Sequence, residues 1–396
     1  MTMTTNPIAA QPINTTIAPP PLTLYLHLPW CIRKCPYCDF NSHRAAKTLP
    51  EEEYVAAMLA DAESAVPQVW GRRIVAAYLG GGTPNLFSPA ALDKLLCGLR
   101  ALFNIAPDAE ITMEANPGAA CEAKFAEYRA LGISRLSLGA QSFNNTLLNS
   151  IGRVHCGKQS QQAAKAAART FGNFNMDLMH ALPGQDVKSA LDDVHTALTF
   201  DPAHLSLYQL TLETGTPFYR RPPPRLPNDD ETAVVGDAVA NFAIGRGFLR
   251  YEISAFSRPK KECAHNLNYW RFGDYLGIGA GAHGKLTIGG KIIRQMRVKN
   301  PNDYMRRAQA GNAIAEQKQV SGREAVFEFL LNALRLTDGF AVNDLAARTA
   351  MTTAAIETEL QKAERDKLIM RTITRIKPSP LGLRFLNDLL MRFLPT

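Results

Sequence analysis

Short runs of strand-forming residues alternate with longer amphipathic stretches over more than half of the chain. A regular alternation of this kind predicts βαβ units and a parallel sheet. The predicted strands are Leu22–Leu28, Ile74–Leu79, Glu110–Glu114, Arg135–Leu138, Asn173–Leu178 and His204–Leu210. The predicted helices span residues 50–66, 88–103, 121–131, 157–171, 187–199 and 230–246. Six such units are fewer than the eight of a closed barrel, so we expect an α/β fold with a partial (β/α)6 TIM-like barrel, and an open doubly wound sheet is the alternative.

The alternation ends near residue 255, so we place the partial barrel at residues 22–255 and expect a connecting region at 256–320. A small C-terminal domain is predicted at 321–396. Its expected elements are helices at 323–336, 343–350 and 353–366, a hairpin at 368–378 and a last helix at 380–394. This order resembles a winged-helix-like α+β module. The would-be recognition helix, Thr353–Arg365, carries glutamates that would repel phosphates, so we expect no nucleic acid as a partner.

Composition places the chain among large globular proteins. Of its 396 residues, 46% are hydrophobic and 20% are charged, which excludes wholesale disorder, collagen and small disulfide scaffolds. The net charge of +8 is a mild excess that fits a solvated surface. Residues 1–21 are rich in proline, carry no charged side chain and lack a cleavage pattern, so we expect a disordered lead rather than a signal peptide or membrane span. We therefore expect a cytoplasmic protein with at most peripheral membrane contact.

Three of the seven cysteines, Cys31, Cys35 and Cys38, crowd into eight residues. An odd number of clustered thiols in a large chain indicates a reducing compartment and a metal or redox site. The spacing C-x3-C-x2-C on a loop after a strand can bind three irons of a [4Fe-4S] cluster and leave the fourth iron free for another molecule. A zinc site completed by His27 or His43 is the alternative.

Glycine-rich and polar motifs follow the predicted strands. Parallel α/β folds build their sites at the carboxyl ends of their strands, so we expect these motifs to meet at one rim. In strand order they are the cysteine motif, Gly80–Pro84, Glu114–Pro117, Gly139–Ser142, Asp177 and Tyr208–Gln209. Glycine permits the close approach of a ligand because it has no Cβ atom. The sequence therefore predicts a binding site at this rim.

The cysteine motif followed by Gly80-Gly81-Gly82-Thr83-Pro84 resembles the radical S-adenosylmethionine (SAM) superfamily. The resemblance implies that the amino and carboxylate groups of SAM bind the fourth iron of the cluster, which donates an electron to the sulfonium. The positions that match SAM-binding positions of the family are Tyr25, Tyr37, Gly81, Gly82, Thr83, Glu114, Gln141, Arg153 and Asp177. A strand tyrosine at Tyr25, loop packing at Tyr37 and a structural ion pair between Arg153 and Asp177 are the alternatives.

Within that superfamily the chain resembles the coproporphyrinogen III dehydrogenase branch and its haem-chaperone relatives, the HemW group. The strings that carry this resemblance are residues 26–31, 114–118, 137–143, 176–179 and 277–284. Two features favour the chaperone group. The dehydrogenase pattern has a fourth cysteine where this chain has Phe40, and it has a longer ordered N-terminal segment.

The third feature is the string His265-Asn266-Leu267-Asn268-Tyr269-Trp270, which matches the HNxxYW string of the haem chaperones. An imidazole can reach haem iron and aromatic rings can lie against a porphyrin, so His265, Tyr269 and Trp270 are candidate haem contacts. His283, in the glycine-rich 279–284 loop, is a rival axial ligand. A core histidine beside an aromatic wedge is the alternative.

The resemblance implies a haem-binding protein that delivers haem to haem-requiring proteins such as respiratory enzymes. The alternative is an oxygen-independent coproporphyrinogen III oxidase that forms protoporphyrinogen IX by oxidative decarboxylation. Monomer and homodimer are both compatible with the resemblance.

Overall fold

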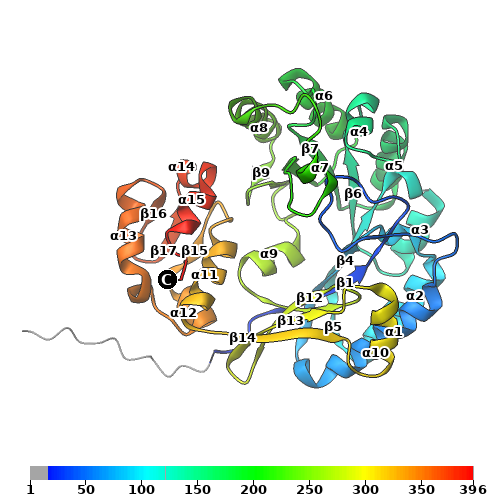
Figure 1. Cartoon of the computed structure of the whole chain (residues 1–396), viewed down its shortest axis with the longest axis horizontal. Helices are drawn as coiled ribbons and strands as arrows, with labels where there is room; N and C mark the ends of the chain where they lie inside the picture. The colour runs from blue at the N-terminus through cyan, green and yellow to red at the C-terminus, as the bar shows by residue number, and fades with distance from the viewer. Residues whose placement is uncertain (1–16, 121, 396) are drawn as a thin grey trace, which may run out of the picture.

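The computed structural model of the chain describes residues 17–120 and 122–395 (Figure 1). Most of the expected disordered lead, residues 1–16, lies outside the described residues. For residues 17–21 that prediction is wrong, because they pack against the body of the protein. Ile17 is only 8% exposed, and the carbonyl of Pro20 accepts a hydrogen bond of 2.5 Å from Arg72.

Among the described residues, a mixed sheet of twelve strands has the order β14-β13-β12-β11-β1-β4-β5-β6-β7-β8-β10-β9. The strands from β11 to β8 in this order run parallel to one another. They are β1 (Leu22–Leu28), β4 (Arg73–Gly81), β5 (Asn104–Ala115), β6 (Arg135–Gln141), β7 (Phe174–His180), β8 (His204–Gln209) and β11 (Asp274–Ile278). The six predicted strands are confirmed, and the sheet ends at β14 and β9 without closing into a barrel.

Helices cover the outer face of this sheet (Figure 1). Each predicted helix is present, as α1 (Glu51–Ala65), α2 (Pro89–Leu102), α3 (Glu122–Ala130), α5 (Gly157–Thr170), α6 (Val187–Leu198) and α8 (Asp229–Gly245). Two short helices, α4 (Asn145–Ser150) and α7 (Pro217–Arg220), were not predicted. Side-chain caps define several starts: the Ser88 hydroxyl accepts from the third residue of α2, and Asp186 does the same for α6.

Strand β1 shows how the sheet is buried on both faces. Leu22, Leu24, Leu26 and Leu28 are at most 1% exposed and belong to the core under the outer helices. The alternate residues therefore face the interior of the partial barrel. This pattern reads as a near-continuous apolar run, as expected for a parallel strand that is covered on both sides.

Residues 256–320, expected only to connect two domains, contribute strands to the same sheet. Strand β11 pairs in parallel with β1, and an antiparallel extension continues from it. Sequence patterning missed these strands because charged side chains are buried among their apolar residues and interrupt the pattern. For example, Lys285 lies 2.8 Å from Asp274, and both are at most 2% exposed. The elements of this region are β9 (Leu249–Arg250), β10 (Ala255–Ser257), α9 (Ala264–Trp270), β12 (His283–Ile288), β13 (Lys291–Arg297), α10 (Pro301–Gln309) and β14 (Ile314–Val320).

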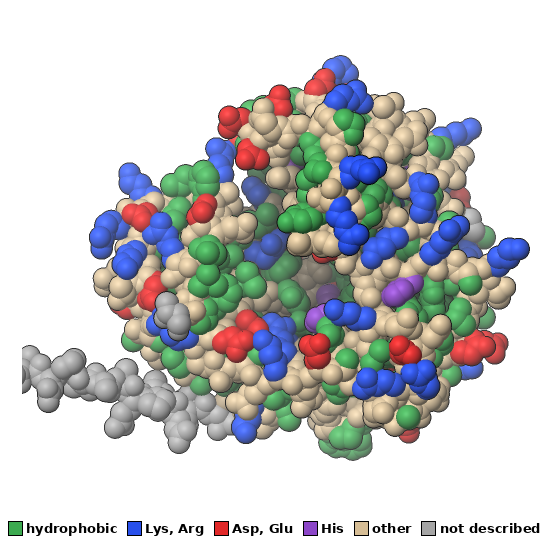
Figure 2. Space-filling model, in the orientation of Figure 1, with side chains coloured by type: hydrophobic (Ala, Val, Ile, Leu, Met, Phe, Trp, Pro, Cys, Tyr) green, Lys and Arg blue, Asp and Glu red, His purple; other side chains and the backbone are tan. Residues whose placement is uncertain are grey.

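The C-terminal module has a core of its own and a small sheet in the order β15-β17-β16. Its elements are α11 (Gly322–Ala333), β15 (Phe340–Ala341), α12 (Val342–Thr349), α13 (Glu357–Arg365), β16 (Ile369–Arg371), β17 (Arg375–Pro378), α14 (Pro380–Arg384) and α15 (Leu386–Met391). The expected hairpin is confirmed. The single last helix is wrong, because the backbone leaves the helical region at Phe385. Figure 2 shows that the surface is hollowed between this module and the barrel. No helix in the described part of the chain is long and apolar enough to cross a membrane.

Candidate functional site

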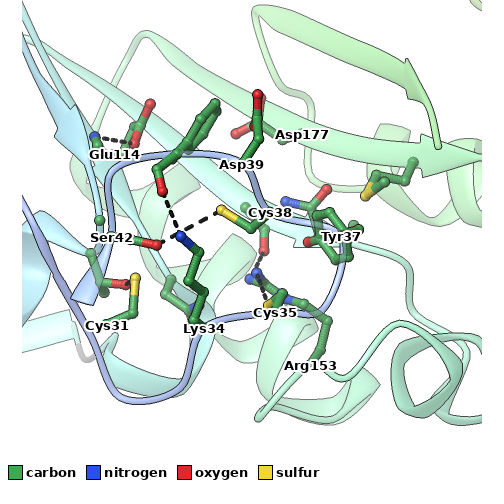
Figure 3. A pocket seen from close by; sticks show the side chains of 18 of the residues that line it. Cys31, Lys34, Cys35, Tyr37, Cys38, Asp39, Ser42, Glu114, Arg153 and Asp177 are labelled. Atoms are coloured by element: carbon green, nitrogen blue, oxygen red, sulfur yellow. Dashed lines mark hydrogen bonds between the residues drawn. The ribbon is translucent and has the colours of Figure 1, made fainter. Parts of the chain in front are cut away.

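A cavity of about 340 Å³ opens at the carboxyl ends of the parallel strands (Figure 3). This is the rim at which the sequence motifs were expected to meet. Its volume falls in the range of small-molecule sites. The predicted site residues on its wall are Cys31, Cys35, Tyr37, Cys38, Gly81, Gly82, Thr83, Glu114, Gln141, Arg153 and Asp177.

The cysteine loop is held at both ends by backbone hydrogen bonds. Short strands β2 (Trp30–Cys31) and β3 (His43–Arg44) pair in parallel, and the Ala45 amide donates to the Cys31 carbonyl at 2.8 Å. In the middle of the loop, the guanidinium of Arg33 donates to the Gly152 carbonyl at 2.6 Å. Hydrogen bonds within the protein therefore shape the loop.

Each of the three sulfur atoms has a polar neighbour of its own. The Thr83 hydroxyl donates to Cys31 Sγ at 3.3 Å, Arg153 Nη1 donates to Cys35 Sγ at 3.7 Å, and Ser42 Oγ lies 3.9 Å from Cys38 Sγ. Burial raises the pKa of the Cys31 and Cys38 thiols, so their thiolates need such donors or a bound cation. Three separately supported thiols fit a cubane, in which each thiolate binds a different iron.

No group of three or more His, Cys, Asp and Glu side chains within residues 17–120 and 122–395 is arranged to hold a single metal ion.

The glycine motif brings the end of β4 against the cysteine loop. The Gly82 amide donates to the Leu28 carbonyl at 2.9 Å, and the Thr83 amide donates to the Trp30 carbonyl at 2.8 Å. A Cβ atom on Gly82 would lie 2.6 Å from the Leu28 carbonyl oxygen, closer than atoms can approach. Gly81 has a φ of +100°, a conformation that favours glycine. Backbone contact therefore explains this motif.

Two carboxyl groups face the cavity from neighbouring strands. Glu114 accepts hydrogen bonds from the Tyr78 hydroxyl at 3.0 Å and from the Gly81 amide at 3.2 Å. Burial, with a contribution from the nearby Asp177 carboxylate, raises the pKa of Glu114 to about 7. Asp177 accepts from Ser137 and Asn175, and burial raises its pKa as well. Glu114 can thus change its charge near neutral pH.

Arg153 and Gln141 also line the cavity. Arg153 donates to the Gly139 carbonyl at 2.9 Å as well as to Cys35, and it forms no ion pair with Asp177 in the described part of the chain. The guanidinium therefore supports the cysteine loop by its hydrogen bond to Cys35. Gln141 has a φ of +65° beside an irregularity in the β6–β7 pairing. Such strain in a non-glycine residue is typical of functional sites.

Tyr25 does not line the cavity, in contrast to the other matched positions. Its hydroxyl lies 3.1 Å from His27 Nδ1, and its ring stands 6.3 Å from the Tyr78 ring. Tyr78 does line the cavity, so Tyr25 lies behind that wall. Its contact with SAM stays a prediction.

The four haem candidates are not gathered around one cavity. His265 is 7% exposed and its ring lies 5.2 Å from that of Tyr78. Tyr269, one turn further along α9, contacts Tyr275 at 5.0 Å between ring centres. Trp270 lies under the guanidinium of Arg335 at 4.4 Å and so joins α9 to the C-terminal module. His283 is an exposed residue at the start of β12.

Tyr78 and Met179 are among the cavity residues to which sequence reasoning gave no role. Tyr78 belongs to none of the motifs and Met179 only ends the 176–179 string, and each stands inside a strand that resembles ordinary core. One signal was available for Tyr78. It stands two residues before Gly80, so alternation along the strand places it on the face that leads to the glycine motif.

Comparison with known proteins places this geometry in a family. The Radical SAM superfamily model matches residues 25–197, and the HemN C-terminal domain model matches residues 320–385. The chain is 41% identical to the haem chaperone HemW of Escherichia coli K12 over 377 residues, which cover 95% of this chain and 98% of that protein. The chain belongs to the HemW family. The haem chaperone HemW of Haemophilus influenzae is 39% identical at the same coverage.

The expected fold class is confirmed for this HemW-family chain. Coproporphyrinogen III oxidase (HemN) from Escherichia coli has a TM-score of 0.81 with it at 22% identity, over 95% of this chain and 90% of that one. At this identity the likeness concerns the fold alone. Membership of the radical SAM superfamily implies a [4Fe-4S] cluster and SAM.

Proposed function

We propose that the protein is a haem chaperone that binds haem, a [4Fe-4S] cluster and SAM, and passes haem to haem-requiring proteins such as respiratory enzymes. The observation that carries this proposal is its end-to-end similarity to proteins named haem chaperones. The cavity adds support. Phe40 lies on its wall, 58% exposed, where the dehydrogenase pattern has a further cysteine.

Cys31, Cys35 and Cys38 would hold the cluster, and the rim residues named above would hold SAM. When bound, the cluster supplies an electron to the SAM sulfonium. The protein orients the ligand: backbone groups of Gly81 and Gly82 line the side next to the cysteine loop, and Glu114 accepts hydrogen bonds from the β4 side. We place the protein in the cytoplasm, as monomer or homodimer, with no nucleic-acid partner and at most peripheral membrane contact.

We expect SAM affinity to rise roughly tenfold between pH 6 and pH 8, because the ionised share of a carboxyl with a pKa of about 7 rises about tenfold over that range. The ionised carboxyl is an acceptor at both oxygens, whereas protonation turns one of them into a donor. Titration calorimetry of SAM into cluster-loaded protein measures the affinity. The variant Glu114→Gln removes this group but leaves the titration of SAM itself. An equal pH slope in both proteins would contradict the role of Glu114.

His265 is our proposed haem ligand. Burial lowers its pKa to about 4, so the imidazole is neutral at pH 7 and can bind a metal. Its Nδ1 atom is buried without a hydrogen-bond partner in the structure, although buried polar atoms are nearly always paired. Tyr269 lies one helical turn away and would offer its ring to the porphyrin.

We expect the variant His265→Ala to lose most of the haem absorbance band that wild-type protein keeps through gel filtration. His283→Ala and the surface variant His195→Ala should keep the band, because both side chains are exposed and replaceable. Loss of the band in His283→Ala but not in His265→Ala would move the ligand to His283. Circular dichroism of each variant checks that α9 is still folded.

The same preparation tests the function itself. Cluster-loaded protein is mixed with coproporphyrinogen III, SAM and a reductant under anaerobic conditions, and porphyrins are followed by fluorescence. We expect no turnover. Conversion to protoporphyrinogen IX would replace the chaperone proposal by the oxidase alternative.

A further inference from the structure

The end of the cysteine loop is fastened to a distant part of the chain by one amide side chain. Asn41 Nδ2 donates to the carbonyls of Ala280 and Lys299, each at 2.9 Å. Its Oδ1 atom lies 3.3 Å from His43 Nε2. Both polar atoms of the amide are therefore engaged. Ala280 belongs to the glycine-rich loop between β11 and β12, more than 200 residues away in sequence.

These contacts close into a ring of hydrogen bonds. The Ala280 amide donates to the Tyr54 hydroxyl at 2.8 Å, and that hydroxyl donates to the His27 carbonyl at 2.8 Å. His27 Nε2 lies 2.9 Å from the carbonyl of Asn41, which completes the ring. Tyr54 is fully buried and His27 is 5% exposed. Water cannot easily replace hydrogen bonds in such surroundings.

The glycines of the 277–284 string are explained by this ring. Gly279 has a φ of +111°, and a Cβ atom there would lie 2.4 Å from the His27 carbonyl oxygen. Gly281 has a φ of +77°, and its Cβ atom would lie 2.3 Å from Asn41 Nδ2. Only glycine allows the loop to approach the cysteine segment this closely. The 277–284 string therefore packs closely against the cysteine segment, although its residues do not line the cavity.

We propose that this ring, the Asn41 clamp, positions Cys38 for the cluster. Asn41 stands three residues after Cys38 and next to Ser42, whose hydroxyl lies 3.9 Å from Cys38 Sγ. Cys31 has supports beyond the clamp, because it pairs with Arg44, the Ala45 amide donates to its carbonyl and Thr83 donates to its sulfur. Loss of the clamp is therefore expected to free the Cys38 thiol and to leave the Cys31 thiol in place. The inference rests on the proposed cluster site, and Asn41 is a positioning residue.

The test compares Asn41→Ala and Gly281→Ala with Gly289→Ala. Gly289 also has a positive φ, +56°, but a Cβ atom there meets nothing within 4 Å, so this variant controls for backbone strain in the same region. In cluster-free protein, the alkylation rate of each thiol by iodoacetamide is measured by mass spectrometry. We expect Cys38 to react roughly tenfold faster in both clamp variants, the effect of losing one or two hydrogen bonds. Cys31 should react as in wild type.

A second measurement follows the reconstituted proteins as they lose iron to a chelator. Both clamp variants should release iron roughly tenfold faster than wild type and the Gly289→Ala control. Equal acceleration at Cys31 and Cys38, or none at either, overturns the proposal, because the clamp would then stabilise the fold in general. If wild-type protein takes up no cluster, the proposed function fails. The alkylation rates, measured in cluster-free protein, still show whether the Asn41 clamp positions Cys38.

Discussion

The variant Cys35→Ala is expected to lower the iron content of anaerobically reconstituted protein from about four atoms per chain to below one. Three thiolates hold the proposed cluster, and no other cysteine among residues 17–120 and 122–395 lines the cavity. Removal of one leaves two ligands for a group that needs at least three from the protein. Arg153, which donates to the Cys35 sulfur, would also lose its partner in the loop. Iron and sulfide assays measure the result.

The matched control for this experiment is Cys97→Ala. Cys97 is an exposed thiol on α2 and donates to Asp93 on its own helix. This variant should take up as much iron as wild type. An electron paramagnetic resonance spectrum of the reduced wild type should shift when SAM is added. Zinc in a well-reconstituted wild type, or a full cluster in Cys35→Ala, would contradict the site.

The second large effect is expected from a single methyl group. In Gly82→Ala, the added Cβ atom would lie 2.6 Å from the Leu28 carbonyl oxygen and 2.7 Å from that of Trp30. Both are backbone atoms on the strand and loop that lead into the cysteines, so neither can move without moving the site. We expect SAM affinity to fall roughly a hundredfold, which corresponds to about 3 kcal/mol of overpacking. Titration calorimetry on the cluster-loaded protein measures the change.

Gly118→Ala is the control at the same rim. A Cβ atom at Gly118 would meet its nearest neighbours at 3.5 Å, an ordinary van der Waals distance. This variant should bind SAM as wild type does. Wild-type affinity in Gly82→Ala would mean that backbone contact at the glycine motif does not shape the SAM site.

Much of the site was predictable because it is local in sequence. Cys31, Cys35 and Cys38 share one loop, and the glycine motif follows directly from a strand. The topology rule that parallel strands end at one rim then brings these motifs together, and the cavity wall confirms it. The exception is Tyr25, which belongs to the right strand but lies behind Tyr78. Motif matching reports the position of a residue along the strand and not what stands between it and the cavity.

The haem candidates show the opposite case. The string around His265 is continuous in sequence, yet its residues are divided on α9 between the barrel interior and the C-terminal module. Helix geometry turns neighbours in sequence by about 100°, so adjacent aromatic residues point in different directions. His283 lies on strand β12 rather than on α9.

Periodicity and short spacings in the sequence were enough to predict the six long strands and the helices between them as far as β8, the family, and the loop that carries the three thiols. Only the tertiary structure decided that β11 to β14 extend the sheet beside β1, that Arg153 serves Cys35, and that Asn41 meets Ala280. These contacts join residues from 118 to more than 200 positions apart. Burial of polar pairs and close backbone approach create them, and neither leaves a local pattern of hydrophobic and polar residues.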